Sequence, residues 1–410
     1  MSPRKVIPIL LVNGISLFVY FYMVSILGLK INFQTMFATN DAKTYWDVAK
    51  WITDGTFTES TAIRPILYPL LLTVCSKVGG VIAIWFVQFC MWLLSINLTF
   101  LSVKRISNSI IWPLLGALII MSNLSFIALT FHALTEVSTI FLLTLLVFIS
   151  IKNREKLFEF SFFKNVLLVI VLLTILKPVF YIPLLGLLFI VLPLFYLRKI
   201  FKNKKQFITL LLILTPLFIQ FSIMKIKHDK ITISTIGQKT IDEYIIAQSY
   251  EDKFNIERDS ALIQVKTLSS DEKNNFVKQN LNIVINRFKL NLQGNILSAP
   301  DYIMSFVSRP NKKLTNYMID VNRFYYKLHF YLLILTLPFL YLLYRKKNYN
   351  LLLISFFFIL LNIYFLTTTG ISFYQGDRLV LPAIGIFSFL YIYIFKELFD
   401  FLYKFIKSKT

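Results

Sequence analysis

Acidic and basic side chains suited to proton transfer and phosphate binding stand beside the long apolar segments of this sequence. Asp41 lies in a polar stretch between the first two apolar segments, and Tyr45, Arg64 and Tyr68 follow it. A carboxylate can take the proton of a hydroxyl group, and a guanidinium binds phosphate oxygens through a rigid fork of donors. This stretch therefore holds residue types that could activate a hydroxyl beside a bound phosphate.

Three more charged residues stand at the ends of apolar runs. Glu136 begins one run, Lys177 lies between two runs in front of Pro178, and Arg378 begins the last run. A carboxylate at the start of an apolar helix needs a partner or a water-filled cavity. Glu136 could serve as a second acidic group, and Lys177 and Arg378 could hold the phosphate of a lipid. Together with Asp41 they form our candidate site.

Each candidate also has a simpler interpretation. Asp41 could be an ordinary solvated loop aspartate. Glu136 could be a carboxylate stabilised by the dipole of its own helix, and Lys177 could reach up to lipid headgroups. Arg378 could pair with Asp377 at the surface or anchor its helix at the membrane interface. The sequence alone leaves these alternatives open.

The elements that must position these residues are membrane helices. Hydrophobic residues make up 57% of the chain and charged residues only 16%, whereas about a quarter of the residues of a soluble domain are charged. The apolar residues occur in runs of about twenty, the length that crosses a hydrocarbon core. We therefore predict an all-α polytopic membrane protein.

The net charge of +22 is explained by where the basic residues stand. Many of them occupy short clusters between apolar runs, where positive charge orients a membrane protein and contacts anionic lipids. We therefore expect membrane lipids as partners, and no nucleic acid. The two cysteines and three histidines show no metal-ligand spacing. We predict no metal site and no certain cofactor; a divalent metal is compatible with the sequence but not indicated by it.

Ten membrane spans fit the apolar runs, at 6–28, 80–103, 109–126, 134–151, 163–178, 179–197, 206–224, 327–344, 349–367 and 379–397. The basic clusters between spans then fall on one side together with both termini, and by the positive-inside rule that side is cytoplasmic. The candidate residues consequently face the other side. The apolar segment 65–78 is too short to span and is predicted to lie in the membrane interface.

This topology divides the chain into three parts. An N-terminal transmembrane module covers 1–224 and contains the first outer loop, 29–79, with Asp41. An extracytoplasmic loop domain covers 225–326, and a C-terminal transmembrane module covers 327–410. The long loop exceeds a simple connection, so we expect a mostly helical cap over the outer face. The predicted location is the cell (inner) membrane, multi-pass, with the site facing the periplasm or exterior.

The pattern resembles the GT-C superfamily of polyprenyl-phosphate-sugar-dependent glycosyltransferases, in particular bacterial protein mannosyltransferase and aminoarabinose transferase-like members. The motifs that carry the resemblance are Asp41 with Tyr45, Ala49 and Gly55, then Arg64-Pro65 and Tyr68-Pro69-Leu70-Leu71, Thr135-Glu136, Lys177-Pro178, and Asp377 to Pro382. Many relatives have Asp-Glu where this chain has Asp41-Ala42, and Tyr where it has Leu379. The resemblance covers most of the first two hundred residues and the last fifty.

The resemblance implies a GT-C-like bundle of about ten helices and a defined chemistry. The donor would be a sugar on a polyprenyl phosphate such as undecaprenyl phosphate, and the acceptor a hydroxyl of a glycan, lipid or protein. Asp41 would act as general base, and the anomeric configuration would invert. Arg378 and Lys177 would stabilise the leaving phosphate, and Arg64, Tyr45 and Tyr68 would belong to the donor-binding group.

Two other functions compete with this one. A Wzy-like polysaccharide polymerase is also polytopic with a large outer loop, and it would use cationic residues of the large loops without requiring Asp41. A lipid-linked oligosaccharide flippase or transporter would carry charged or polar residues deep in several spans, or inverted repeats. The predicted spans are nearly uncharged at mid-depth and the two halves look dissimilar, which argues against the transporter.

Overall fold

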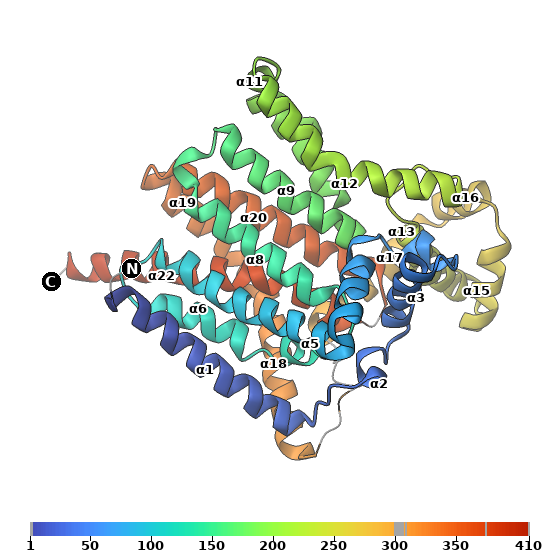
Figure 1. Cartoon of the computed structure of the whole chain (residues 1–410), viewed down its shortest axis with the longest axis horizontal. Coiled ribbons are helices and arrows are strands. Elements are labelled where there is room, and N and C mark those ends of the chain that lie inside the picture. The colour runs from blue at the N-terminus through green and yellow to red at the C-terminus, as the bar shows by residue number, and fades with distance from the viewer. Residues whose placement is uncertain (1–2, 299–306, 308–309, 374, 409–410) are drawn as a thin grey trace.

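The computed structural model describes residues 3–298, 307, 310–373 and 375–408, and within these residues it contains helices and no strands (Figure 1). The N-terminal half comprises α1 (Pro3–Leu27), α2 (Phe33–Met36), α3 (Asn40–Asp54), α4 (Ser60–Ile63), α5 (Leu67–Lys104), α6 (Ile111–Met121), α7 (Leu124–Leu129), α8 (Glu136–Lys152), α9 (Phe160–Leu176), α10 (Tyr181–Gly186), α11 (Leu197–Phe201) and α12 (Lys204–His228). The remainder comprises α13 (Ile236–Ile241), α14 (Ala247–Phe254), α15 (Arg258–Thr267), α16 (Ser270–Gln279), α17 (Leu281–Gln293), α18 (Lys312–Leu332), α19 (Thr336–Arg345), α20 (Tyr349–Thr368), α21 (Gly376–Val380) and α22 (Ile384–Lys407).

Seven helical stretches in the described residues are long and apolar enough to cross a membrane, which confirms the predicted all-α multi-pass class. They are Ile7–Leu27, Leu67–Lys104, Pro178–Phe201, Lys204–His228, Lys312–Arg345, Tyr349–Ile371 and Arg378–Lys407. The other three predicted spans, 109–126, 134–151 and 163–178, coincide with shorter helices: α6 with 11 residues and α8 and α9 with 17 each. The count of ten spans therefore stays a prediction.

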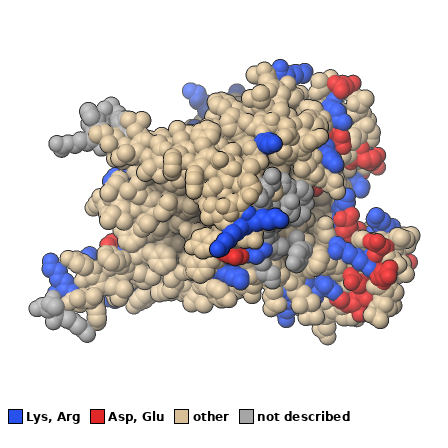
Figure 2. All heavy atoms as spheres, turned by 90° about the horizontal axis from the view of Figure 1, so that it is seen from below, with Lys and Arg blue, Asp and Glu red and all other residues tan. Residues whose placement is uncertain are grey.

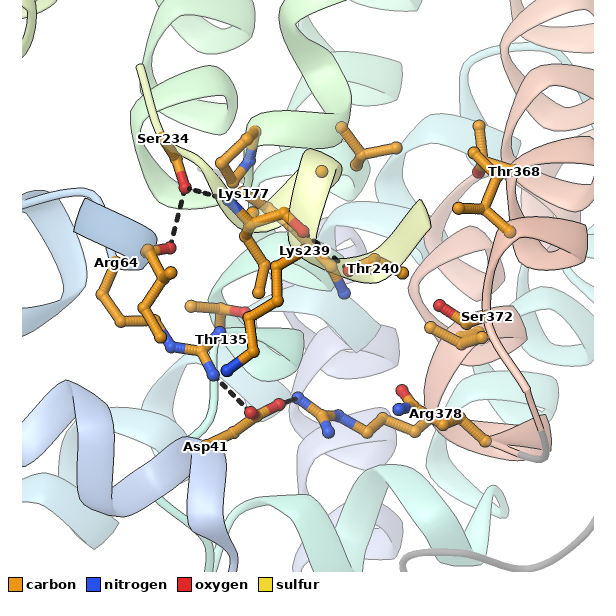
Figure 3. Close-up of a pocket in the computed structure, with 18 of the residues that line it drawn as sticks. Asp41, Arg64, Thr135, Lys177, Ser234, Lys239, Thr240, Thr368, Ser372 and Arg378 are labelled. Atoms are coloured by element: carbon orange, nitrogen blue, oxygen red, sulfur yellow. Dashed lines mark hydrogen bonds and ion pairs between the residues drawn. The ribbon is translucent and has the colours of Figure 1, made fainter. Parts of the chain in front are cut away.

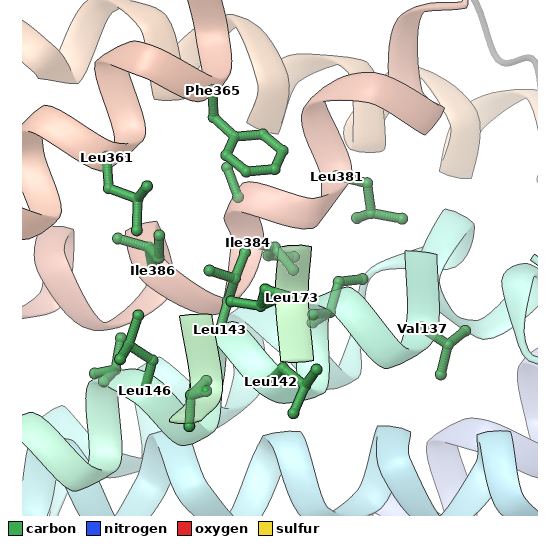
Figure 4. Close-up of a cluster of buried hydrophobic side chains, with 14 of the residues drawn as sticks. Val137, Leu142, Leu143, Leu146, Leu173, Leu361, Phe365, Leu381, Ile384 and Ile386 are labelled. Atoms are coloured by element: carbon green, nitrogen blue, oxygen red, sulfur yellow. The ribbon is translucent and has the colours of Figure 1, made fainter. Parts of the chain in front are cut away.

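The C-terminal helix α22 runs through the middle of the bundle. It packs against α5, α6, α8 and α20. In its apolar part, 83% of the residues are buried inside the protein, compared with 17% in the apolar part of α1. Figure 4 shows apolar side chains of α8, α9, α20 and α22 meeting in this core. The N-terminal helix α1 instead lies along one side, with large apolar side chains exposed as lipid contact requires.

Helices α8 and α22 approach each other closely at Gly385. A Cβ atom added there would lie 2.6 Å from Oγ1 of Thr144 and 3.0 Å from the carbonyl oxygen of Ile140. Small residues allow helix backbones to approach in this way. Since Glu136 begins α8 and Arg378 stands just before α22, this contact helps to fix the distance between those two side chains.

Helix α5 contains the break that separates the predicted segment 65–78 from the predicted span 80–103. Gly79 and Gly80 have non-helical backbone angles, and Gly80 adopts φ 59° and ψ −141°, a conformation that glycine reaches without steric cost. The position of 65–78 in the membrane interface stays a prediction.

Residues 229–298, called the central segment below, contain α13–α17 and a small apolar core of their own. That core consists of Ile246, Ala247, Val265 and Phe276. The central segment lies at the end of the molecule opposite the two chain termini (Figure 1). Figure 2 shows most of the acidic side chains on the displayed face gathered at this same end, whereas the face over the bundle is mostly uncharged.

The next membrane helix begins earlier than predicted. Helix α18 starts at Lys312, so the predicted boundary between 326 and 327 falls inside a helix. The reason is that α18 is amphipathic, with its buried side chains in one stripe at helical spacing. The buried residues are Thr315, Ile319, Asn322, Tyr326 and His329. Several of them are polar, so the stripe does not form an apolar run in the sequence.

Candidate functional site

A continuous chain of ion pairs joins five charged side chains that lie far apart in the sequence. Arg64 and Arg378 each bind one carboxylate oxygen of Asp41 (Figure 3). Nε of Arg378 lies 2.9 Å from Oε1 of Glu136, and Nζ of Lys177 lies 3.3 Å from the same oxygen. Three cations and two carboxylates therefore alternate through one site.

The first turn of α3 positions Asp41. The side chain of Thr39 caps this helix by accepting a hydrogen bond of 3.0 Å from the backbone nitrogen of Ala42. A helix N-terminus favours negative charge, so the carboxylate stands where its own helix stabilises it. Asp41 was predicted to lie in a loop; the structure instead gives it a helical backbone.

Arg64 follows α4, and its guanidinium has three restraints besides its backbone. Nε donates a hydrogen bond of 2.8 Å to Oγ1 of Thr44, Nη2 binds Asp41, and the guanidinium carbon lies 4.5 Å from the centre of the Tyr45 ring. A cation over an aromatic face is attracted to it. The Tyr68 ring packs edge-on against Tyr45, with 5.2 Å between the centroids, so it supports the tyrosine that contacts Arg64.

Glu136, Lys177 and Arg378 come from three helix ends. Glu136 is the first residue of α8, Lys177 follows α9 with an extended backbone, and Arg378 lies in α21. Arg378 is 7% exposed and Glu136 is 1% exposed. The pairing of Arg378 with Asp41 and Glu136 thus occurs inside the protein, and its guanidinium is not at the surface.

One oxygen of Glu136 has no hydrogen-bond partner among the described atoms. Oε1 is shared by Arg378 and Lys177, but Oε2 is buried and accepts nothing. Buried carboxylate oxygens are normally hydrogen-bonded. Glu136 lines the cavity described below, but Oε2 itself is enclosed by protein atoms.

The charges around Asp41 decide its protonation. Burial raises the pKa of the Asp41 carboxyl, but Arg378 and Arg64 outweigh burial and hold that pKa well below its usual range. Asp41 is consequently ionised at neutral pH. The same contacts occupy both of its oxygens, so the carboxylate as it stands is a weak base.

A cavity of about 580 Å³ opens beside these ion pairs. It is lined by residues between Asn40 and Arg64, by the turn after α9, by α20, by the residues around Arg378, and by the central segment. Four cationic side chains and three carboxylates face it among the described residues: Arg64, Lys177, Lys239, Arg378, Asp41, Glu136 and Glu243. Hydroxyl and amide side chains also line it, including Thr135, Ser234, Thr240, Ser372 and Gln375.

The structure therefore brings most of the predicted residues to one place. Asp41, Tyr45, Arg64, Glu136, Lys177 and Arg378 all line the cavity, whereas Tyr68 lies behind Tyr45 and does not. The two other aspartates of α3 stand apart from it. Asp47 is half-buried and pairs with Lys50 at 3.1 Å, and Asp54 is exposed at the end of α3.

The cavity residues of the central segment were not predicted from the sequence. Ser234, Lys239, Thr240, Glu243 and Tyr244 belong to it, but they occur in a polar stretch without a motif or an apolar border. A charged residue is conspicuous only where the surrounding sequence is apolar, so nothing in this stretch singles out Lys239 from other lysines.

No metal-binding cluster is present in the described part of the chain, where no three or more His, Cys, Asp or Glu side chains are grouped to hold an ion. The carboxylates of the cavity are neutralised by guanidinium and ammonium groups instead.

In comparisons with known proteins, no family model, no curated protein and no solved structure matches this chain.

Proposed function

We propose that this protein is an integral membrane glycosyltransferase. It would move a sugar from a polyprenyl-phosphate donor to a hydroxyl of a glycan, lipid or protein acceptor, with inversion at the anomeric carbon. The observation that carries the proposal is the alternating chain of Arg64, Asp41, Arg378, Glu136 and Lys177 beside a cavity among apolar helices. The proposal includes the ten-span topology, the outer position of 225–326, and a cavity facing the periplasm or exterior.

The charge of the cavity suits a phosphodiester. Four cationic side chains against three carboxylates leave an excess of one positive charge among the described lining residues. A sugar joined to a lipid through one phosphate carries one negative charge, so its binding would neutralise the cavity. When the bond to the sugar breaks, the phosphate gains charge, and Arg378 and Lys177 stand where cations would stabilise it.

An apolar border of the cavity suits the lipid part of such a donor. Val179, Tyr181 and Ile182 line the cavity from the turn after α9 and the start of α10, and Tyr364 and Phe365 line it from α20. Ile182 is 62% exposed. A prenyl chain lying against these side chains would remain in the hydrocarbon region while its phosphate reached Arg378 and Lys177.

Binding of the donor would also free Asp41 from its ion pair with Arg378. A phosphate that binds Arg378 competes with Asp41 for the guanidinium, because both are anions that accept its hydrogen bonds. Once Asp41 loses a cation, its pKa rises and one oxygen becomes free. The carboxylate is then suited to general-base catalysis, so the donor would bind before the proton transfer occurs.

The transfer itself follows from these positions. Asp41 accepts the proton of the acceptor hydroxyl, and the hydroxyl oxygen forms a bond to the anomeric carbon. The bond between that carbon and the phosphate oxygen breaks, and its electron pair stays on the phosphate. The products are the inverted glycoside and the polyprenyl phosphate.

One observation favours a second candidate, a polysaccharide polymerase. Lys239 of the central segment lines the cavity, and a polymerase of the Wzy type would rely on cations from its large loops. That enzyme would use a lipid-pyrophosphate donor with more negative charge than the cavity excess provides, and it would not require Asp41.

The experiment that tests the proposal compares lipid-linked sugars and cell-envelope glycans from cells that make the wild-type protein or Asp41→Asn at equal levels. We expect the variant to accumulate a polyprenyl-phosphate sugar and to lack one sugar residue in a glycan, lipid or protein product. An unchanged profile from Asp41→Asn together with accumulation of a pyrophosphate-linked repeat unit in Lys239→Ala would favour the polymerase. Identical profiles from both cultures would contradict the proposed function.

A further inference from the structure

The strongest unassigned feature is a buried amide that ties the central segment to the connection between α20 and α21, which precedes Arg378. Asn295 lies in the helical turn Gly294–Ser298 after α17, and its side chain is completely buried. Nδ2 donates hydrogen bonds to the carbonyl oxygens of Thr369, at 2.9 Å, and Ser372, at 2.6 Å. Oδ1 accepts hydrogen bonds from the backbone nitrogens of Gln375, at 2.8 Å, and Gly376, at 2.9 Å.

These four contacts use the full hydrogen-bonding capacity of the amide. The NH₂ group has two hydrogens to donate and the carbonyl oxygen has two lone pairs, and each is matched by a backbone group of one connection. An aspartate has no hydrogens to offer the two carbonyl groups, and alanine has neither donor nor acceptor. Asparagine therefore fits this position in a way that its closest substitutes do not.

The clamped connection leads directly to Arg378. It joins α20 to α21, and the backbone nitrogen of Arg378 donates to the carbonyl oxygen of Gln375 at 3.1 Å. Gly376 has a positive φ of 31°, a region that favours glycine. Asn295 thus holds the backbone that enters this unusual conformation, two residues before the arginine whose guanidinium reaches Asp41 and Glu136.

Helix α17 of the central segment also packs against the connection between α20 and α21. A Cβ atom added at Gly370 would lie 2.7 Å from the ring of Phe288 in α17. The end of α17 and the connection are therefore packed without spare room. Displacement of the connection away from Asn295 would have to move this packed surface as well.

We propose that Asn295 is a positioning residue that holds Arg378 for an anionic ligand with a phosphate group. The need for it follows from the competition described above: a bound phosphate takes the place of Asp41, so the guanidinium loses one of the carboxylates that orient it. Its backbone must then hold the cation in position, since a preorganised cation stabilises charge without the cost of rearrangement. The identity of the ligand as a lipid phosphate rests on the proposed function.

The test uses the full-length protein in lipid nanodiscs with undecaprenyl phosphate as the probe. We expect Asn295→Asp to weaken binding about tenfold and Asn295→Ala by more. The reason is that hydrogen bonds between Asn295 and the connection, called the clamp below, are lost. Asn291→Ala is the matched control. This neighbouring amide is equally buried but donates to the carbonyl oxygen of Tyr244, within the central segment, at 3.1 Å. Its removal should change binding less than twofold.

A double-mutant cycle separates positioning from general stability. If Asn295 acts through Arg378, then Asn295→Asp should weaken binding in the wild type but add no further loss to Arg378→Ala. Independent, multiplying losses would overturn the proposal. So would wild-type affinity of a folded Asn295→Asp protein whose only defect is a lower unfolding temperature.

Hydrogen exchange provides a readout that does not depend on the ligand. The amides of Gln375 and Gly376 should exchange at least tenfold faster in Asn295→Ala than in Asn291→Ala, since they lose their acceptor. If the wild-type protein does not bind undecaprenyl phosphate, the proposed donor is wrong, and the clamp is still judged by this exchange. Unchanged exchange at both amides would refute the clamp whatever the ligand is.

Discussion

Replacement of Arg378 by alanine is the perturbation whose consequences follow most directly from the ion-pair chain. The guanidinium joins Asp41 to Glu136 and is buried. Its removal leaves two carboxylates near each other, with Arg64 on one and Lys177 on the other. Breaking a buried ion pair by removing one partner typically costs about 3–5 kcal/mol. We expect the lower half of that range, because each carboxylate keeps one cation.

The effect on transfer should exceed the effect on folding. Loss of one group that stabilises developing negative charge usually lowers the rate by about a hundredfold to a thousandfold. Arg378→Lys should recover part of this loss, because an ammonium restores the charge but not the forked geometry. The assay is transfer from a polyprenyl-phosphate sugar in membranes, normalised to the amount of folded protein.

A compensated variant and a matched control make this prediction specific. Adding Glu136→Gln to Arg378→Ala removes one of the two neighbouring negative charges. The double variant should therefore regain stability without regaining transfer. Arg287→Ala breaks another arginine–aspartate pair, with Asp252 in the central segment, and should leave transfer unchanged. If Arg378→Ala retained wild-type transfer and lipid-phosphate binding, the reasoning about the ion-pair chain would be refuted.

Three further predictions concern separate parts of the structure. Glu136→Gln alone should reduce both stability and transfer, because Arg378 and Lys177 lose their shared carboxylate; wild-type melting and turnover would contradict this. Asp41 has a lowered pKa, so its contribution to stability should be constant above about pH 4, its unfolded pKa, and should decline as pH falls further; the acid-induced loss of melting temperature should be smaller in Asp41→Asn. Gly385→Ala should destabilise the protein by about 1–3 kcal/mol, measured by unfolding, because its Cβ would meet Thr144.

The membrane helices were largely predictable because their physical signal is strong and local. Apolar runs of spanning length mark the helices regardless of their partners. The start of α18 was missed for the opposite reason: Asn322 and His329 are buried by neighbouring helices, and a hydropathy pattern cannot anticipate those neighbours. The short α6, α8 and α9 likewise depend on where turns interrupt an apolar run.

The candidate site was predictable in its parts but not in its assembly. Asp41, Glu136, Lys177 and Arg378 were conspicuous because each stands beside apolar sequence. Nothing in the sequence indicated that Arg378 lies between the two carboxylates, since that contact joins helices separated by most of the chain. This contact makes all four residues parts of one electrostatic unit.

The contribution of the central segment could not have been predicted. Lys239 and Asn295 are polar residues in a polar stretch, where composition carries no information about burial. The role of Asn295 depends on four backbone groups that approach it only in the folded protein. Side chains that serve by contacting backbone leave no pattern of types and spacings in a single sequence.

The most direct test of the account is the rate of sugar transfer by Asp41→Asn. The amide keeps the size of the carboxylate and part of its hydrogen bonding but removes its basicity, so the protein should remain folded in the membrane. Asp47→Asn and Asp54→Asn are the controls, because both aspartates lie in the same segment but outside the cavity. With a polyprenyl-phosphate sugar as donor, we predict that Asp41→Asn lowers transfer about a hundredfold or more and that the controls change it little. Near-normal transfer by Asp41→Asn would contradict the account.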